Sequence, residues 1–345
     1  MDRMRMKEHG LPPKRRATVI DVARLAGVSP GTVSNAINGK RRVDAETRAR
    51  IDAAIRELGY RPNMAARGMR TGRANTIALF SSMSTAVSAG PSRLGFMMEI
   101  AASASLTALT RNVALVLVPP IPDPEAALGA VPLDGALLVE PARDDPFLPI
   151  LAARAIPTVA IGGAHDAASA HVDLRYADTA DLLIGHLHAR GARHVPLVIG
   201  SSARRYYEVF EARYLDHAAR TGMTPRILRI DESRGEAAAE AGLSALLAQG
   251  HRVDGLLVPV DALATGALAA LRRAGLRVPE DVRVATRYNG LRAQAATPPL
   301  TAVELHFDAV ASAATLALLD LIDGLDVPQV LTAESPALIE RASTR

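Results

Sequence analysis

The residues best suited to chemistry near the start of the chain are polar side chains that follow Pro30. Four of them recur at a spacing that leaves one helix with a polar face: Thr32, Ser34, Asn35 and Asn38. Hydroxyl and carboxamide groups both donate and accept hydrogen bonds. A helix that presents them together is suited to contact a polar surface.

Local capping signals predict the helices that position this face. Thr18 and Asp21 have the spacing of a capping box at a helix start, and an apolar face follows before Gly27 ends the helix. Ser29 then caps a second helix, and Pro30 suits its first position because proline lacks the N–H that would be unpaired there. The predicted unit is a helix-turn-helix.

A third helix and a basic arm complete this part of the chain. Asp44 opens the helix, Gly59 ends it as a left-handed cap, and its apolar residues recur at helical spacing: Ile51, Ile55 and Leu58. The arm, residues 62–73, contains Gly68, which costs about 1 kcal/mol relative to alanine in a helix. We therefore expect the arm to fold only on its partner.

Charge is distributed unevenly along the 345 residues. Residues 1–76 contain 17 Lys and Arg against 7 Asp and Glu, whereas the remainder contains 23 against 29. A basic head on an acidic body fits nucleic-acid binding, although a basic surface can also serve solubility alone. Residues 1–17 are expected to form a disordered basic tail.

Composition also sets expectations about location and excludes some chemistry. The sequence contains no cysteine, which excludes disulfides and thiolate chemistry. We find neither an apolar run long enough to span a bilayer nor a secretory signal pattern, and we expect a cytoplasmic protein with no membrane partner.

After Gly72 short apolar runs alternate with amphipathic helical stretches, which is typical of parallel sheets with crossover helices. The predicted strands are residues 76–80, 113–118, 136–139, 158–161, 194–199, 226–230, 255–258 and 282–285. The predicted helices are residues 93–110, 123–130, 145–154, 177–190, 204–221, 235–249, 262–273 and 307–323. A division near residues 162–171 would give two α/β lobes.

Several motifs occur together in one order in the N-terminal part: Asp21-Val22-Ala23, Ala26-Gly27-Val28-Ser29, Thr32-Val33-Ser34, Asn38 and Gly59-Tyr60-Arg61-Pro62-Asn63, with Ala66 beyond. This order resembles the headpiece of the lactose-repressor (LacI/GalR) family of bacterial transcription regulators. A helix-turn-helix pattern alone is a weak signal, and the motif of the arm adds the specificity that it lacks.

The remainder resembles the effector domain of that family, which has the fold of periplasmic sugar-binding proteins. The resemblance rests on segments such as residues 191–195, 261–267 and 275–282. It implies an α/β protein with an all-α helix-turn-helix headpiece and a bilobed effector domain of two parallel-sheet lobes. The expected parts are a headpiece at 18–61, a hinge helix at 62–73, a first lobe at 74–162 and 287–323, and a second lobe at 163–286 and 324–345.

The resemblance also implies how the headpiece meets DNA. Its recognition helix would be residues 30–37, with bases chosen at Pro30, Gly31 and Asn35. The first two offer almost no hydrogen-bonding side chain, so direct readout rests on Asn35, unless that residue merely faces solvent. Expected phosphate contacts are Thr18, Ser29, Thr32, Ser34, Asn38, Thr47 and Arg42. For Arg42, which belongs to a basic loop, the alternative is a loop that is only solvated.

In the hinge, Met69 stands where the family usually has leucine, and Asn63 and Ala66 belong to the same arm. By resemblance, Met69 would wedge into the minor groove at the centre of a palindromic operator when two subunits meet there. The alternative is a residue that packs between the lobes.

The family holds its effector between the lobes, at the carboxyl ends of strands. Asp261 has the position of a ligand-contacting Asp, but Val260 replaces the usual Asn before it, and residues 286–289 replace a segment with a family Asp. The usual Arg after the strand at 194–199 has no clear equivalent. The candidates, each of which can instead be structural, are Ser84, Arg93, Phe96, Glu140, Tyr207, Glu208, Asp261, Tyr288 and Asn289.

These patterns favour a dimeric DNA-binding transcription regulator, a repressor controlled by a small-molecule effector such as a sugar. Two alternatives remain: a ligand-insensitive regulator with a degenerate cleft, and a transport-type solute-binding protein. We expect no enzyme, cofactor or metal site, because no catalytic triad, metal-spaced His cluster or phosphate-binding Gly loop is evident.

Overall fold

The computed structural model describes residues 17–38, 42–60, 72–88, 95–118, 123–163 and 167–345. Contacts divide the chain into two compact units, Met1–Arg73 and Ala74–Arg345, and each is described by itself. Among the described helices, none is long and apolar enough to cross a membrane.

The first unit contains three short helices, α1 (Val19–Ala26), α2 (Pro30–Asn38) and α3 (Ala45–Leu58). Their apolar faces meet in one small core made of Val22, Ala23, Ala26, Val33, Ala36, Ile51 and Ala54. Arg48 of α3 also donates to the carbonyl oxygen of Ala36 at 2.6 Å, which ties α3 to α2. The three helices agree with those predicted from caps and periodicity.

The predicted caps of these helices are formed. The Thr18 backbone N–H donates to Asp21 Oδ2 at 2.9 Å, and the Asp21 N–H donates to Thr18 Oγ1 at 3.3 Å, which completes the capping box. Gly27 and Gly59 end α1 and α3 with φ of 66° and 57°, a conformation that favours glycine because it has no Cβ.

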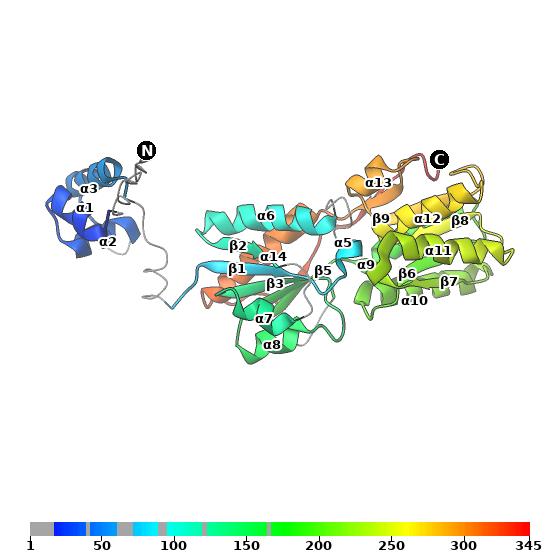
Figure 1. Ribbon diagram of the computed structural model, residues 1–345, viewed down its shortest axis with the longest axis horizontal. Helices are drawn as coiled ribbons and strands as arrows, with labels where there is room; N and C mark the ends of the chain where they lie inside the picture. The colour runs from blue at the N-terminus through cyan, green and yellow to red at the C-terminus, as the bar shows by residue number, and fades with distance from the viewer. Residues whose placement is uncertain (1–16, 39–41, 61–71, 89–94, 119–122, 164–166) are drawn as a thin grey trace, which may run out of the picture. The chain divides into compact units, whose positions relative to one another are not determined.

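The second unit consists of two α/β lobes, each built on a six-stranded sheet (Figure 1). The strand order in the first lobe is β11-β5-β4-β3-β1-β2, and all its pairs are parallel. These strands are β1 (Thr76–Phe80), β2 (Ala114–Leu117), β3 (Gly135–Val139), β4 (Thr158–Ile161), β5 (Ala170–Asp173) and β11 (Val330–Thr332).

Helices cover both faces of this first sheet. On one face α6 (Phe96–Thr110) packs against α14 (Phe307–Ile322), and on the other lie α7 (Pro124–Gly129) and α8 (Phe147–Ala153). Alternate residues of β1 therefore enter different cores, Ile77 in one and Ala78 in the other. Burial on both faces explains why the strands read as continuous apolar runs.

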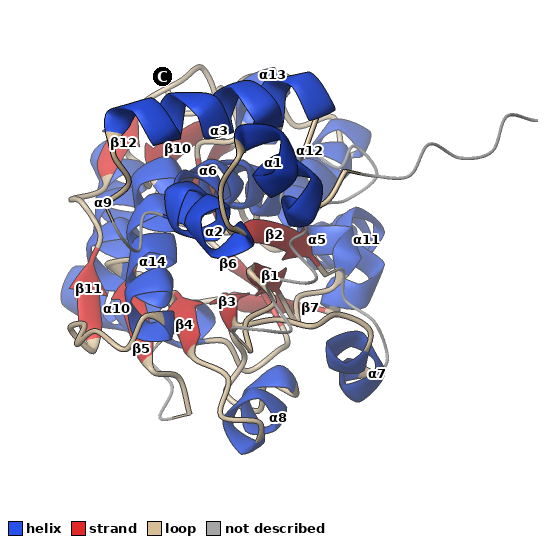
Figure 2. Ribbon diagram, turned by 90° about the vertical axis from the view of Figure 1, so that its left-hand side faces the viewer, coloured by secondary structure: helices blue, strands red, loops and turns tan. Residues whose placement is uncertain are grey.

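The second lobe repeats the plan of the first, whose strands are seen in order from β11 to β2 in Figure 2. Its own strand order is β12-β10-β9-β8-β6-β7. Its strands are β6 (Leu197–Gly200), β7 (Ile227–Ile230), β8 (Gly255–Val258), β9 (Arg283–Tyr288), β10 (Thr301–Glu304) and β12 (Ala337–Ile339), of which only β12 is antiparallel to its neighbour. Its main helices are α9 (Tyr176–Ala189), α10 (Arg205–Thr221), α11 (Gly235–Ala248) and α12 (Asp261–Arg273). Shorter elements are α5 (Thr85–Ser88), which leaves the first lobe, η1 (Glu232–Arg234) and α13 (Leu291–Ala295).

The polypeptide crosses from one lobe to the other at different residues from those that we predicted. The predicted second lobe began at residue 163, but β5 pairs with β4 in the first sheet. The predicted return began at residue 287, but β10 pairs with β9 in the second sheet. The chain returns with α14 and then with β11, which pairs with β5 in the first sheet although we predicted residues 324–345 in the second lobe. Each of these short strands lies between two others, β5 between β4 and β11 and β10 between β9 and β12. Pairing with distant strands rather than a local pattern places them, so the boundary predictions were wrong. Two crossings contain left-handed residues, Arg175 and His306, each with a positive φ immediately before a helix.

Candidate functional site

Helix α2, which we predict to be the recognition helix, has one buried and one accessible side. Val33 and Ala36 are in the core, whereas Pro30 and Gly31 are exposed at its N-terminus. Asn35 is half-buried, as are Thr32 and Ser34. The first turn of the helix is thus open to a partner.

Hydroxyl groups surround that helix start. The side chain of Ser29 accepts the Thr32 N–H at 3.1 Å and lies 2.9 Å from the Thr32 hydroxyl. Ser29 is exposed, as is Arg42 in the loop before α3. Thr47 is half-buried and sits in the first turn of α3, where its N–H donates to Asp44. These positions suit groups that hold a DNA backbone, which stays a prediction.

Four of the predicted site residues, Asn63, Ala66, Met69 and Arg93, lie outside the described residues. Asn38 lies at the end of α2 and its side chain is not described.

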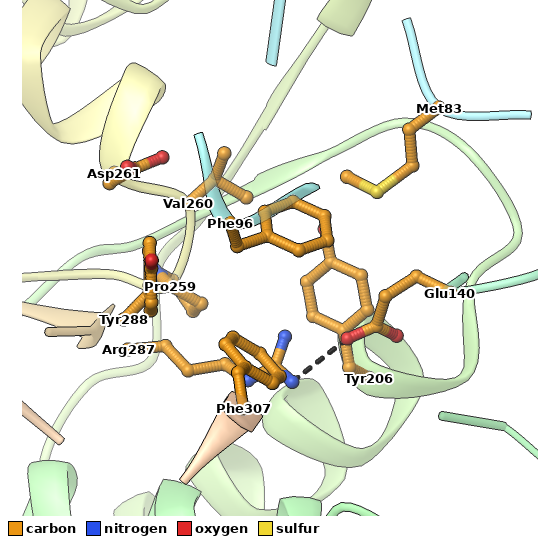
Figure 3. A pocket seen from close by; sticks show the side chains of 10 residues that line it. All are labelled: Met83, Phe96, Glu140, Tyr206, Pro259, Val260, Asp261, Arg287, Tyr288 and Phe307. Atoms are coloured by element: carbon orange, nitrogen blue, oxygen red, sulfur yellow. Dashed lines mark hydrogen bonds and ion pairs between the residues drawn. The ribbon is translucent and has the colours of Figure 1, made fainter. Parts of the chain in front are cut away.

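Between the lobes of the second unit lies a cavity of about 20 Å³. Figure 3 shows its wall, to which both lobes contribute: Met83, Phe96, Glu140, Tyr206, Pro259, Val260, Asp261, Arg287, Tyr288 and Phe307. A cavity of this size holds about one water molecule. The wall is mainly apolar and aromatic, and its charged groups are the chemically distinctive part.

A buried ion pair joins the lobes across this cavity. Arg287 of β9 donates to Glu140, which follows β3, at 2.8 Å, and these side chains are 7% and 3% exposed. The Tyr176 hydroxyl donates to the second oxygen of the same carboxylate at 2.5 Å, and Arg204 donates to the Glu140 carbonyl oxygen. Glu140 thus receives three donors from the opposite lobe, and its φ of 48° is a left-handed conformation that costs backbone strain.

Neighbouring residues stabilise the Glu140–Arg287 pair and leave space for it. The Arg287 guanidinium carbon lies 5.0 Å from the ring centroids of both Tyr176 and Tyr206, within the range of cation–π contacts. Gly162 leaves room for the network, because a Cβ there would lie 2.4 Å from the Tyr176 hydroxyl. Burial alone would lower the pKa of Arg287, but the Glu140 carboxylate raises it above its ordinary value.

Asp261 differs from Glu140 because one of its two carboxylate oxygens has no hydrogen-bond partner. The side chain is buried at the start of α12, and Oδ1 accepts the Ala262 N–H at 2.8 Å. Arg292 approaches to 3.6 Å, but Oδ2 has no hydrogen-bond partner. Burial raises the pKa of this carboxyl, and Arg292 opposes the shift only in part. A buried acceptor without a donor is costly, which marks Asp261 as a place where a ligand can bind.

Three aromatic rings line the cavity as one cluster. The centroid of Tyr288 lies 6.2 Å from that of Phe96 and 5.3 Å from that of Phe307. The Tyr288 hydroxyl donates to Glu99 of the first lobe, so this group is already paired. Burial and that hydrogen bond to Glu99 raise the pKa of Tyr288.

The cavity brings together four of the predicted ligand residues, Phe96, Glu140, Asp261 and Tyr288. The other described candidates make different contacts. Ser84 accepts the Ala86 N–H, Tyr207 is buried and donates to Glu232, Glu208 pairs with Arg143 and Arg205, and Asn289 contacts Glu304 and Arg341.

Sequence reasoning missed six residues of the wall: Met83, Tyr206, Pro259, Val260, Arg287 and Phe307. Arg287 had a usable signal, because it lies in the same segment as Tyr288, at the end of a predicted strand and beside the lost family Asp. Tyr206 could not be told from Tyr207 without the geometry of α10.

Two parts of the chain match family models. Residues 18–63 match the bacterial regulatory proteins of the lacI family, and residues 184–344 match a periplasmic binding protein-like domain. The HTH-type transcriptional regulator CelR of Thermobifida fusca is 31% identical over 326 residues, which cover 90% of this chain and 93% of CelR. The chain belongs to the LacI family of bacterial regulatory proteins.

Solved structures agree with this membership. A lac repressor dimer bound to operator and the anti-inducer ONPF has a TM-score of 0.77 with this LacI-family chain, at 25% identity, and the match covers 96% of this chain and 99% of that one. The CelR–cellobiose complex has a TM-score of 0.69 at 28% identity, with 95% and 100% covered. A LacI-family chain with a helix-turn-helix is a DNA-binding transcription regulator, and a transport-type solute-binding protein has no use for that unit.

Proposed function

We propose that this LacI-family regulator is a cytoplasmic repressor that binds a palindromic operator as a homodimer and responds to a small molecule in the interlobe cleft. The observation that carries the proposal is the unused Oδ2 of Asp261, buried between two lobes of a chain that also carries a helix-turn-helix. A ligand that donates to Asp261 while touching Phe96 or Phe307 would hold both lobes at a defined separation.

The names of similar proteins support the repressor and effector parts of the proposal. The lac repressor structure is described as bound to operator and an anti-inducer, and the CelR structure as bound to cellobiose. Coupling between two such sites requires only that the ligand bind one lobe arrangement better than another.

Exposed apolar side chains support a homodimer. On α6, Leu106 is 69% exposed and Leu109 is 62% exposed, and Met98 two turns earlier is 46% exposed. They lie on one side of the helix, at a spacing that suits packing against another apolar face. We propose that a second copy of the chain covers them. Replacing Leu106 and Leu109 with glutamate should then give a monomer in sedimentation, whereas the same change at exposed Leu215 on α10 should leave a dimer.

Selection of random double-stranded DNA on the full-length protein tests the DNA part of the proposal. The recovered sequences should share a two-fold symmetric site, because a dimer presents two recognition helices related by symmetry. Recovery of no common site, at low salt where phosphate contacts are strongest, would contradict a sequence-specific regulator.

The second candidate is the regulator that does not respond to a ligand. Its support is the Glu140–Arg287 pair, which closes the cleft with groups of the chain itself. Genes next to the recovered sites suggest a candidate effector. Measuring operator affinity with and without that compound distinguishes the ligand-controlled regulator from the ligand-insensitive one. The ligand-controlled regulator should change its affinity and lose that response in Asp261→Ala, with DNA binding intact, and Tyr288→Ala should change which effector is accepted. An affinity that never responds would favour the second candidate.

A further inference from the structure

Backbone groups join the two lobes beside the buried ion pair. The Arg143 N–H donates to the Ala203 carbonyl oxygen at 2.8 Å, and Ala142 forms an isolated antiparallel bridge with Arg204. The loop after β3 in the first lobe thus pairs with the segment before α10 in the second. Groups of the chain itself therefore hold the lobes together at this point.

This loop is shaped by contacts within its own lobe. Asp145 is buried, and its carboxylate accepts the N–H groups of Ala142 and Phe147 at 3.3 and 3.0 Å. The Ser82 hydroxyl donates to the same carboxylate. These contacts do not depend on the second lobe, so little conformational entropy is lost when the loop pairs across the cleft.

Closing the lobes also brings apolar side chains together across the cavity. Met83 and Phe307 line it from the first lobe and are buried, as is Tyr206 from the second. Phe96 of the first lobe meets Tyr288 of the second edge to face, with ring centroids 6.2 Å apart, and Figure 3 shows these side chains around one space. Separation of the lobes would return apolar surface to water, which is unfavourable. The apolar wall therefore favours the closed cleft.

The buried ion pair makes this closure conditional. In the closed cleft Glu140 and Arg287 compensate one another, whereas in an open cleft water hydrates each of them, so the intact pair shifts the balance little. Loss of either partner is different, because the remaining charge is buried without a counter-charge only while the lobes are closed. A single unpaired charge therefore favours the open cleft.

We propose that the cleft closes without a ligand, driven by its apolar wall, and that it opens when Glu140 or Arg287 loses its partner in the ion pair. The closed cavity of about 20 Å³ has room for about one water molecule, so an effector binds only after the lobes separate. A compound that pairs with either charged group would then hold the cleft open. That consequence rests on the proposed function, because it concerns the effector of the same site.

The test measures the distance between the lobes in the full-length protein with no ligand added. The sequence contains no cysteine, so Ala153→Cys on α8 and Ala219→Cys on α10, both at exposed positions, give one site for a nitroxide label in each lobe. Double electron–electron resonance gives the distance, and dilution with unlabelled protein leaves only label pairs within one chain. Refolding from urea beforehand removes any bound small molecule.

The parent should show one narrow distribution of distances. Arg287→Ala and Glu140→Gln each leave one charge unpaired, and each should raise the ratio of open to closed chains at least about a hundredfold, with longer distances. Glu140→Gln combined with Arg287→Met removes both charges and should restore the distances of the parent, because the apolar wall still closes the cleft. Arg277→Ala is the matched control. Arg277 pairs with Asp281 at the same 2.8 Å on the surface of the second lobe, and its loss should leave the distances unchanged.

Two single variants are used so that one still tests the proposal if the other does not fold, which urea unfolding shows. Three results would overturn it: long or broad distances in the refolded parent, the distances of the parent in every folded single variant, or open lobes in the double variant. Failure of the proposed DNA function is seen separately, as the lack of a common site in the DNA selection.

Discussion

The polar groups of the headpiece surface and those of the interlobe cleft have opposite environments. In the headpiece, the side chain of Ser29 bonds to Thr32, three positions away, and Ser29 is exposed to a partner. In the cleft, Glu140 and Arg287 lie 147 residues apart in the sequence and form a buried ion pair. The headpiece is a surface on which polar groups can bind an external partner. In the cleft, most polar groups already bind other residues of the chain.

This difference has an energetic meaning. Exposed polar groups cost little when unpaired because water satisfies them, so a DNA-contacting face needs no internal support. Buried charges must be paired, and loss of one partner leaves the other uncompensated. Substitutions in the headpiece should therefore change binding more than stability, whereas those in the cleft should change stability strongly.

The largest expected effect is the loss of the interlobe pair. Arg287→Ala should lower the free energy of unfolding of the second unit by about 3–5 kcal/mol, because it leaves Glu140 charged and buried. Arg277→Ala is the control: Arg277 is 69% exposed and pairs with Asp281 at 2.8 Å. It should cost about 0–1 kcal/mol, as exposed pairs do. Urea unfolding measures both, and equal costs would mean that the cleft is no different from the surface.

The next effect concerns DNA and should leave stability nearly unchanged. Asn35→Ala should lose roughly 1–3 kcal/mol of affinity on the best site and flatten the preference at one base pair of each half-site. Arg42→Ala, a change in an exposed loop, should weaken all sequences alike. Site selection with each variant measures this. An unchanged preference in Asn35→Ala would show that the recognition helix is wrongly aligned.

The smallest effect is an opposite response to pH in the two regions. Burial raises the pKa of Asp261 above 3.8, so the folded state keeps a proton that the unfolded chain has lost, and stability falls as pH rises from 3.8 through the folded pKa. Asp261→Asn removes this loss, so its advantage over the parent should grow across that range. Hydrogen bonds from Thr47 lower the pKa of Asp44, so its contribution is present above 3.8 and is lost as pH falls through its folded pKa.

Unfolding of Asp261→Asn, Asp44→Ala and the parent between acid and neutral pH measures these two contributions. For each variant, the free energy of unfolding relative to the parent is plotted against pH. If both differences changed in the same direction as pH rises, the contrast between the two regions would be contradicted.

The headpiece was predictable from the sequence because its structure is set locally. Thr18, Gly27, Ser29 and Gly59 act on residues within one turn, so the cap pattern determines each helix end. The apolar strands and amphipathic helices of the second unit were predictable for a similar reason, and each predicted element overlaps an observed one.

The cleft was only partly predictable because it depends on contacts between distant segments. Asp261 and Tyr288 could be named from strand ends, but the pairing of Glu140 with Arg287 and Tyr176 requires the relative placement of both lobes. The short strand β5 likewise has an ordinary sequence and is defined by its neighbours β4 and β11. No local periodicity contains that information.

The salt dependence of operator affinity tests the central claim, a DNA-binding regulator, most directly. The exposed Arg42 and the basic composition of residues 1–76 predict that the full-length protein neutralises several phosphates and releases their counterions. Affinity for the selected site should fall by about 10³–10⁵ between 50 and 200 mM salt if 6–10 phosphates are contacted, and less steeply in Arg42→Ala. An affinity that is the same at both salt concentrations would contradict the account.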